Sequence, residues 1–262
     1  MDAPLVSVIT PTTGRQHLLP ALYEVFLTQT YSNLELLIHE DGPARSTYLD
    51  SIQDQRVRYI YSVKKITTGA KRNRLIQEAR GEIIVFFDDD DYYSPEYITA
   101  MIGFLEDADM VKLSGWFAYS VLHDNFFYWD TTDANEIHFK VGKGPIGTQN
   151  AKKAGATIMN MFMDGYGFSY VFRKKAFSSI AFPDIDFGED IAFVTAAKEQ
   201  HKRIKYINDQ TGLAIHMLHA NNLSLTYPQY RLPGFVISRI FPGYPSYSWM
   251  IGRTQRPTIS TS

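Results

Sequence analysis

The chain has 262 residues, which is enough for one large domain or for two fused halves. Its 45% hydrophobic and 21% charged residues are typical of a globular protein with a buried core. Lys and Arg number 26 and Asp and Glu number 28, so the net charge of −2 gives no overall attraction to nucleic acid or to an anionic membrane. We therefore expect no nucleic-acid partner, and any phosphate-binding site must be local.

The chain contains no cysteine, which excludes disulfides and thiolate metal ligands. This composition fits a reducing compartment, and we expect a cytoplasmic location. The N-terminal residues lack the pattern of a signal peptide, and no apolar run approaches the ~18 residues of a membrane span. We expect no transmembrane segment, whereas peripheral contact with a membrane stays open.

The first hundred residues alternate apolar strands with helical patterns. The expected strands are Leu5–Thr10, Leu34–Ile38, Val57–Tyr61 and Glu82–Phe87. The expected helices are Gln16–Gln29, Thr68–Ala79 and a third that Ser94 caps, with Pro95 at its first position. This alternation predicts an α/β fold with a mostly parallel sheet covered on both faces, in which ligands bind beyond the carboxyl ends of the strands. These ends are Pro11–Arg15, Glu40–Gly42 and Asp88–Asp91.

The second half has a less regular pattern. The expected strands are Met110–Ser120, Phe126–Trp129, Gly167–Phe172, Ile204–Ile207 and Leu213–Leu218, and the expected helix is Glu189–Gln200. The segment Lys140–Gly155 is rich in Gly and Lys, which predicts a mobile loop. The tail from Tyr227 onward is rich in Pro, Tyr and Gly and shows little periodicity.

The strongest chemical feature is a run of four aspartates, Asp88–Asp91, at the end of an apolar strand. Adjacent carboxylates repel one another unless a cation or hydrogen-bond donors offset their charge. Carboxylate oxygens are ligands suited to Mg²⁺ or Mn²⁺. Alternate residues of a strand share a face, so Asp88 and Asp90 are expected on one face and Asp89 and Asp91 on the other. Such a pair can hold a divalent ion that bridges two phosphates, and a solvated acidic turn is the alternative.

Several further motifs follow one another in order along the chain. They are Val6–Thr12, Gln29–Leu36 with Glu40–Gly42, Lys71–Asn73 with Ala79–Ile83, Phe87–Asp91 with Pro95–Glu96, Gly188–Asp190, and His219 with Asn222 and Ser224. Together they resemble the family 2 glycosyltransferases, a large inverting group with the GT-A fold. The resemblance implies a GT-A, Rossmann-like half over residues 1–107 that binds a nucleotide sugar. It also implies a smaller mixed half over residues 108–225 that binds the acceptor, and a tail over residues 226–262. Three roles stay open for the tail: it covers the acceptor cleft, docks a partner or contacts a membrane.

The resemblance also implies a role for each matching position. The implied nucleotide-binding residues are Pro11, Thr12, Asp41, Lys71, Arg72, Asp88 and Asp89. The implied metal ligand for Mn²⁺ or Mg²⁺ is Asp90, with Asp88 and His219 as further candidates. A structural role for His219 stays open, and His216 is a weaker candidate on the other strand face. The implied general base is Asp190, with Glu189 as the fallback.

Two positions depart from the family pattern. The acidic pair is usually Asp-Asp but is Glu40-Asp41 here, which is a mild change. Thr13-Gly14 stands where Tyr-Asn is usual, and the loss of a large side chain near the base leaves the identity of the nucleotide less defined. The expected reaction is inverting transfer from a nucleotide-diphosphate sugar, UDP-sugar first, to a hydroxyl of a glycan, lipid, peptide or small molecule. A sugar-nucleotide nucleotidyltransferase and a non-catalytic nucleotide-sugar-binding module are the alternatives. The single glycine after the first strand argues against the former.

Overall fold

The computed structural model describes residues 3–133, 137–140, 147–150, 153, 156–219, 222 and 226–244. Its first part is a parallel sheet of β1 (Val6–Thr13), β2 (Leu34–Asp41), β3 (Val57–Ser62) and β4 (Ile83–Phe86), with β1 between β2 and β4. The connecting helices are α1 (Leu19–Leu27), α2 (Thr47–Ser51), α3 (Thr68–Glu78) and α4 (Tyr97–Phe104). The register places Thr13 of β1 opposite Asp41 of β2, so both strands deliver polar groups to the same edge of the sheet.

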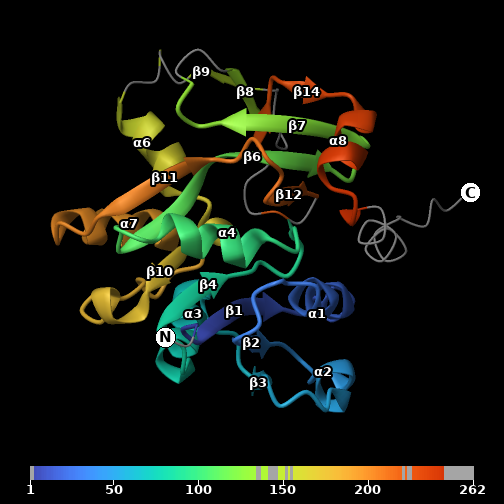
Figure 1. The fold of residues 1–262 in the computed structure, drawn as a ribbon, viewed down its shortest axis with the longest axis vertical. Helices are drawn as coiled ribbons and strands as arrows, with labels where there is room; N and C mark the ends of the chain where they lie inside the picture. Colours follow the sequence, from blue (N-terminus) through green and yellow to red (C-terminus); the bar gives the residue numbers. More distant parts are fainter. Residues whose placement is uncertain are drawn as a thin grey trace, which may run out of the picture.

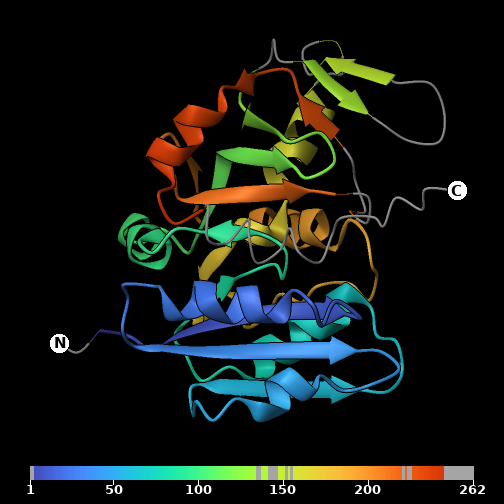
Figure 2. The same cartoon turned by 90° about the vertical axis from the view of Figure 1, so that its right-hand side faces the viewer.

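The second part continues the same sheet with mixed strand directions. Strand β10 (Val171–Arg173) runs antiparallel between β4 and β6 (Met110–Ser120) and joins the two parts (Figure 1). The remaining strands of this sheet are β5 (Tyr92–Tyr93), β7 (Asn125–Asp130), β11 (Ile204–Asn208), β12 (Ala214–Leu218) and β14 (Arg231–Leu232). A smaller sheet contains β8 (Ile137–Lys140), β9 (Gly147–Asn150) and β13 (Thr226–Pro228), and it lies at the far end of the molecule from the parallel strands (Figure 2). The other helices are α6 (Ala156–Asp164), η1 (Gly167–Ser169), η2 (Lys174–Phe177), α7 (Glu189–Glu199) and α8 (Gly234–Ile240).

Apolar side chains cover both faces of the sheet. Val8 belongs to a core with the helices α1 and α4, whereas its neighbour Ile9 belongs to a second core with Leu75 of α3 and Phe193 of α7. Successive residues of a strand point to opposite faces, so β1 contributes to both cores. The α/β fold predicted from the alternation of strands and helices is confirmed. No helix in the described part of the chain is long and apolar enough to cross a membrane.

Several local predictions are wrong. Helix α4 begins at Tyr97 rather than at Pro95, and the side chain of Ser94 does not cap it. Instead the N–H of Ser94 donates to the carbonyl of Leu213 at 2.8 Å, because β5 draws this segment against β12. The strand predicted for Gly167–Phe172 begins only at Val171, after the short helix η1. The loop predicted for Lys140–Gly155 contains β9 in its described part, and most of the remaining segment lies outside the described residues. The tail from Tyr227 onward, for which no element was predicted, contains β14 and α8.

Candidate active site

A cleft of about 380 Å³ opens at the carboxyl ends of β1 and β4. Its walls come from Pro11–Thr13 and Arg15 after β1, Thr68, Lys71 and Arg72 of α3, Asp88–Asp90 after β4, Gly165–Phe168 around η1, and Gly188–Ile191 at the start of α7. The first turns of α3 and α7 border this space, and helix N-termini favour negatively charged ligands. The cleft therefore lies at two of the three strand exits that were expected to bind a ligand, those after β1 and β4, whereas Glu40–Gly42 does not line it.

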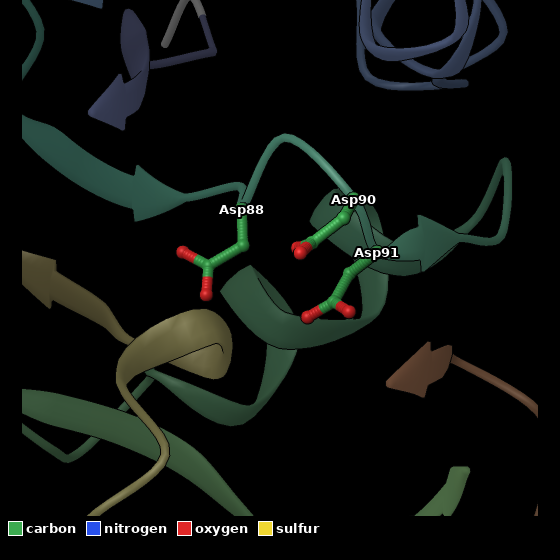
Figure 3. A group of neighbouring side chains, drawn as sticks. All are labelled: Asp88, Asp90 and Asp91. Carbon is green, nitrogen blue, oxygen red and sulfur yellow. The ribbon is translucent and has the colours of Figure 1, made fainter. Parts of the chain in front are cut away.

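Three aspartates in the turn after β4 form a cluster of oxygen ligands. One oxygen each from Asp88, Asp90 and Asp91 lies within 4.8 Å of the others (Figure 3). The expected alternation of faces, with Asp91 opposite Asp90, is wrong because β4 ends at Phe86 and the aspartates occupy a turn. These hard oxygen donors, of which Asp88 and Asp90 line the cleft, fit a divalent cation such as Mg²⁺ or Mn²⁺.

Positively charged and imidazole groups from distant segments surround the aspartates. Arg15 Nη1 lies 2.9 Å from Asp89 Oδ1 and 2.6 Å from Asp90 Oδ2. His219 Nε2 lies 2.7 Å from the same oxygen of Asp90. His216 Nδ1 lies 2.9 Å from Asp91 Oδ2. Sequence reasoning gave no role to Arg15 or Asp91 and rated His216 low. The only available signal for Arg15 was a basic residue at a strand exit.

Burial and neighbouring charges shift the pKa values of the aspartates. Burial and the other three carboxylates raise the pKa of Asp88 to about 8 despite the nearby Arg72. Burial and the charge of Asp90 raise the pKa of Asp89 to about 6. Burial also raises the pKa of Asp90, but the hydrogen bond to His219 and the charge of Arg15 outweigh it and hold that pKa at about 2. A bound divalent cation offsets repulsion of this kind.

Asp41 lies beneath the cleft rather than on its wall. Its side chain is fully buried, with Oδ1 accepting from Lys71 Nζ at 2.7 Å and from Thr13 Oγ1, and Oδ2 accepting from the Ile66 amide at 2.6 Å. Burial raises the pKa of Asp41, but the hydrogen bonds from Lys71 and Thr13 outweigh it and lower that pKa. Lys71 also donates to the Thr12 carbonyl at 2.8 Å. Asp41 thus fixes two groups, Lys71 and Thr13, that line the cleft.

The two acidic residues at the start of α7 have different partners. Glu189 is buried and pairs with Nη1 of Arg72 at 2.5 Å, and burial raises its pKa in spite of that neighbouring charge. Asp190 lines the cleft, and its Oδ2 accepts from the Gly167 amide at 3.2 Å. The other nitrogen of the fork, Arg72 Nη2, lies 4.0 Å from Asp88 Oδ1, so Arg72 stands between Glu189 and the aspartate cluster.

The fold and this cleft define a glycosyltransferase of the GT-A type. The chain matches the glycosyl transferase family 2 model over residues 7–178, and it belongs to that family. It is 29% identical over 231 residues to the uncharacterized glycosyltransferase EpsJ of Bacillus subtilis, covering 84% of this chain and 63% of that protein. It is 27% identical over 127 residues to the Escherichia coli enzyme WfgD, described as a UDP-Glc:alpha-D-GlcNAc-diphosphoundecaprenol beta-1,3-glucosyltransferase, covering 48% of this chain and 49% of that protein.

Solved structures share the fold at low sequence identity. S. aureus TarS in complex with UDP-GlcNAc superposes with a TM-score of 0.60 at 16% identity, covering 83% of this chain and 60% of that one. The mannosyltransferase PcManGT from Pyrobaculum calidifontis, in complex with GDP-Man and Mn²⁺, superposes with a TM-score of 0.58 at 14% identity, covering 85% and 59%. The resemblance proposed from the motifs is confirmed. The family assignment favours a transferase over the nucleotidyltransferase and the non-catalytic module.

Proposed function

We propose that this glycosyltransferase moves a sugar from a UDP-sugar to an acceptor hydroxyl with inversion at the anomeric carbon. The observation that carries the proposal is that Asp190 lines the same cleft as Asp88 and Asp90, two members of the aspartate cluster. One group is suited to take a proton, and the other is suited to bind the cation of a nucleotide diphosphate. The acceptor belongs to a glycan, a lipid, a peptide or a small molecule.

The nucleotide part of the donor lies along the exit of β1 in this proposal. Main-chain groups of Pro11 and Thr12 face the base, and Lys71 stands beside them with its ammonium fixed by Asp41. Uracil is the base proposed, since WfgD is named for a UDP-Glc donor and TarS is in complex with UDP-GlcNAc. The diphosphate then extends toward Asp88, Asp89 and Asp90.

Asp88, Asp90 and Asp91 are the residues of this chain that would hold Mn²⁺ or Mg²⁺, with His219 against Asp90. A divalent cation bound there supplies positive charge that stabilises the departing diphosphate. The Mn²⁺ in the PcManGT complex supports this role. In this arrangement His219 orients the carboxylate of Asp90, because their hydrogen-bonded atoms are 2.7 Å apart.

Asp190 is the proposed general base. Its carboxylate borders the cleft, and the amides of Gly167 and Ile191 donate to its oxygens at 3.2 and 2.8 Å. These bonds fix the side chain, and its ionised form can accept the proton of the acceptor hydroxyl. The hydroxyl oxygen then attacks the anomeric carbon from the face opposite the diphosphate, so one displacement inverts the configuration. Glu189 is the weaker candidate for the base, because its carboxylate already pairs with Arg72.

The test is thermal unfolding with UDP, GDP, dTDP and CDP, each with Mn²⁺, Mg²⁺ or EDTA. A ligand that binds only the folded state raises the melting temperature. We expect UDP with a divalent ion to raise it, and Asp90→Asn to abolish the rise. The control Asp107→Asn removes an exposed carboxylate that pairs with Lys205, and it should behave as the parent. A rise with another nucleotide alone would overturn the UDP assignment, and product NMR showing retained configuration would overturn the inversion.

A further inference from the structure

The guanidinium of Arg15 contacts Asp90, one of the three aspartates of the candidate cation site, and also its neighbour Asp89. Its Nη1 is within 3 Å of both Asp89 Oδ1 and Asp90 Oδ2, at 2.9 and 2.6 Å. The same Asp90 oxygen has His219 Nε2 at 2.7 Å. A carboxylate oxygen offers about two lone-pair directions, so these two neighbours occupy both of them. That oxygen cannot ligate a cation while Arg15 remains in place.

Arg15 cannot leave by losing its proton. A guanidinium stays charged throughout the accessible pH range. Although burial lowers the pKa of Arg15, the charges of Asp89 and Asp90 outweigh it and raise that pKa further. For Oδ2 of Asp90 to ligate a cation, the side chain of Arg15 therefore has to move. It lines the cleft with 31% of its surface exposed, and the preceding Gly14 has a left-handed φ of 59° with open space around its Cα.

Arg15 also keeps donors for a second partner. Both of its contacts use Nη1, and its Nη2 and Nε make no hydrogen bond to the residues that the structure describes. The planar fork of a guanidinium matches the oxygens of a phosphate, so a diphosphate in the cleft would provide an alternative partner. The guanidinium of Arg15 can thus exchange the aspartates for the diphosphate of the donor while it stays in the cleft.

We propose that Arg15 is an internal counter-ion that holds Asp89 and Asp90 in the metal-free protein, and that it moves to the donor diphosphate when the divalent cation binds. The inference rests on the proposed function, since it assumes that the cation binds at the aspartates. Its consequence is that metal alone binds weakly. Metal and nucleotide then bind with positive cooperativity, because the nucleotide stabilises the displaced position of Arg15.

The test is direct titration of Mn²⁺, with free ion measured by electron paramagnetic resonance, in the absence and presence of UDP. In the parent we expect weak binding of Mn²⁺ alone and tighter binding with UDP. Arg15→Gln removes the competing charge, so it should bind Mn²⁺ alone about tenfold more tightly or better, and UDP should add less to that affinity. The matched control Arg203→Gln removes an exposed guanidinium that pairs with Asp109, and it should leave Mn²⁺ binding unchanged.

The outcomes separate the two proposals. If Arg15→Gln binds Mn²⁺ alone no more tightly than the parent, while Asp90→Asn abolishes binding, the role of Arg15 is wrong and the metal site stands. If Asp90→Asn binds Mn²⁺ as the parent does, the metal site itself is wrong and the inference fails with it. An equal gain in Arg203→Gln would attribute the effect to net charge and would also overturn the role of Arg15. Melting curves of each variant check that it is folded.

Discussion

Arg72 of α3 and Glu189 of α7 form a buried ion pair, 2.5 Å between Nη1 and Oε1, that ties together two helices whose first turns border the cleft. The guanidinium packs between the rings of Phe86 and Phe182, with centroid distances of 5.0 and 5.4 Å. It also rests against Gly167, which lacks the Cβ that would crowd it. The pair therefore orients the start of α7, where the proposed base Asp190 lies.

We predict that breaking this pair is more harmful than removing it. Arg72→Met leaves the carboxylate of Glu189 buried without its partner, which should lower the free energy of unfolding by about 3 kcal/mol or more. The double variant Arg72→Met/Glu189→Leu replaces both charges by apolar groups and should recover much of that loss. Urea denaturation of the parent, both single variants and the double variant measures the coupling free energy between Arg72 and Glu189. A double variant less stable than either single one would contradict the prediction.

The close approach of Gly167 to Arg72 gives a second prediction. A Cβ at Gly167 would lie 3.0 Å from Nη1 and Nη2 of Arg72, so Gly167→Ala should push the guanidinium away from its position between Glu189 and Asp88. We expect transfer activity to fall more than stability, because the displaced group borders the cleft. The matched control is Gly103→Ala, where an added Cβ meets nothing within 4 Å. Equal transfer activity of Gly167→Ala and Gly103→Ala would show that the close contact between Gly167 and Arg72 has no functional importance.

A third prediction concerns the proposed base. Asn at position 190 can still accept from the Gly167 amide but cannot take a proton, so Asp190→Asn should lower kcat by about 10²–10⁴-fold. The metal-dependent stabilisation by UDP should not change, because the acceptor reacts on the other side of the sugar. Glu189→Gln is the control, since its remaining oxygen can still accept from Arg72, and it should lose less activity. If Glu189→Gln were inactive and Asp190→Asn active, the two roles would be exchanged.

The fourth prediction is a pH dependence of stability from Lys112. This fully buried residue of β6 donates to the carbonyls of Met163 and Gly165, and burial lowers its pKa from 10.5 to about 7. Between these two values the unfolded chain binds one more proton than the folded chain, so the free energy of unfolding rises with pH. The rise is at most about 1.4 kcal/mol per pH unit, and it is complete above the unfolded pKa.

Urea denaturation from pH 6 to pH 10 measures this effect as a difference between variants. Lys112→Met lacks the titrating group, so its stability should rise less steeply than that of the parent over this range. Lys205→Met removes a lysine that is 44% exposed on β11, and it should keep the slope of the parent. Parallel curves for the parent and Lys112→Met would exclude a titrating lysine at this position.

The regular half of the fold could be predicted because its signals are local. The apolar run Leu34–Ile38 and the helical spacing within Thr68–Ala79 identify β2 and α3, and the alternation of such elements defines the parallel sheet. The predicted start of α4 was wrong because the N–H of Ser94 donates to the carbonyl of Leu213, a partner 119 positions along the chain. At this position a tertiary contact, rather than the local preference of Ser for a helix N-cap, determines the conformation of the chain.

The candidate site was predicted as a set of residues but not as a set of contacts. Asp88, Asp90, His219, Lys71 and Asp190 do lie around one region, whereas their partners depend on how distant elements pack. Arg15 meets Asp90 across 75 positions of the chain, and His216 meets Asp91 across 125. No periodicity or spacing encodes these pairs. The contact of Asp41 with Lys71 likewise depends on how α3 packs against the ends of β1 and β2.

Strand β10 has a mechanical consequence. It pairs with β4 on one side and β6 on the other, so hydrogen bonds run without interruption from the parallel strands to the mixed strands of the second part. Two lobes joined in this way cannot rotate about a hinge without breaking the sheet. The spacing between the two parts of the sheet is therefore set by the backbone. Any closing of the cleft around its substrates has to come from loops and from side chains such as Arg15.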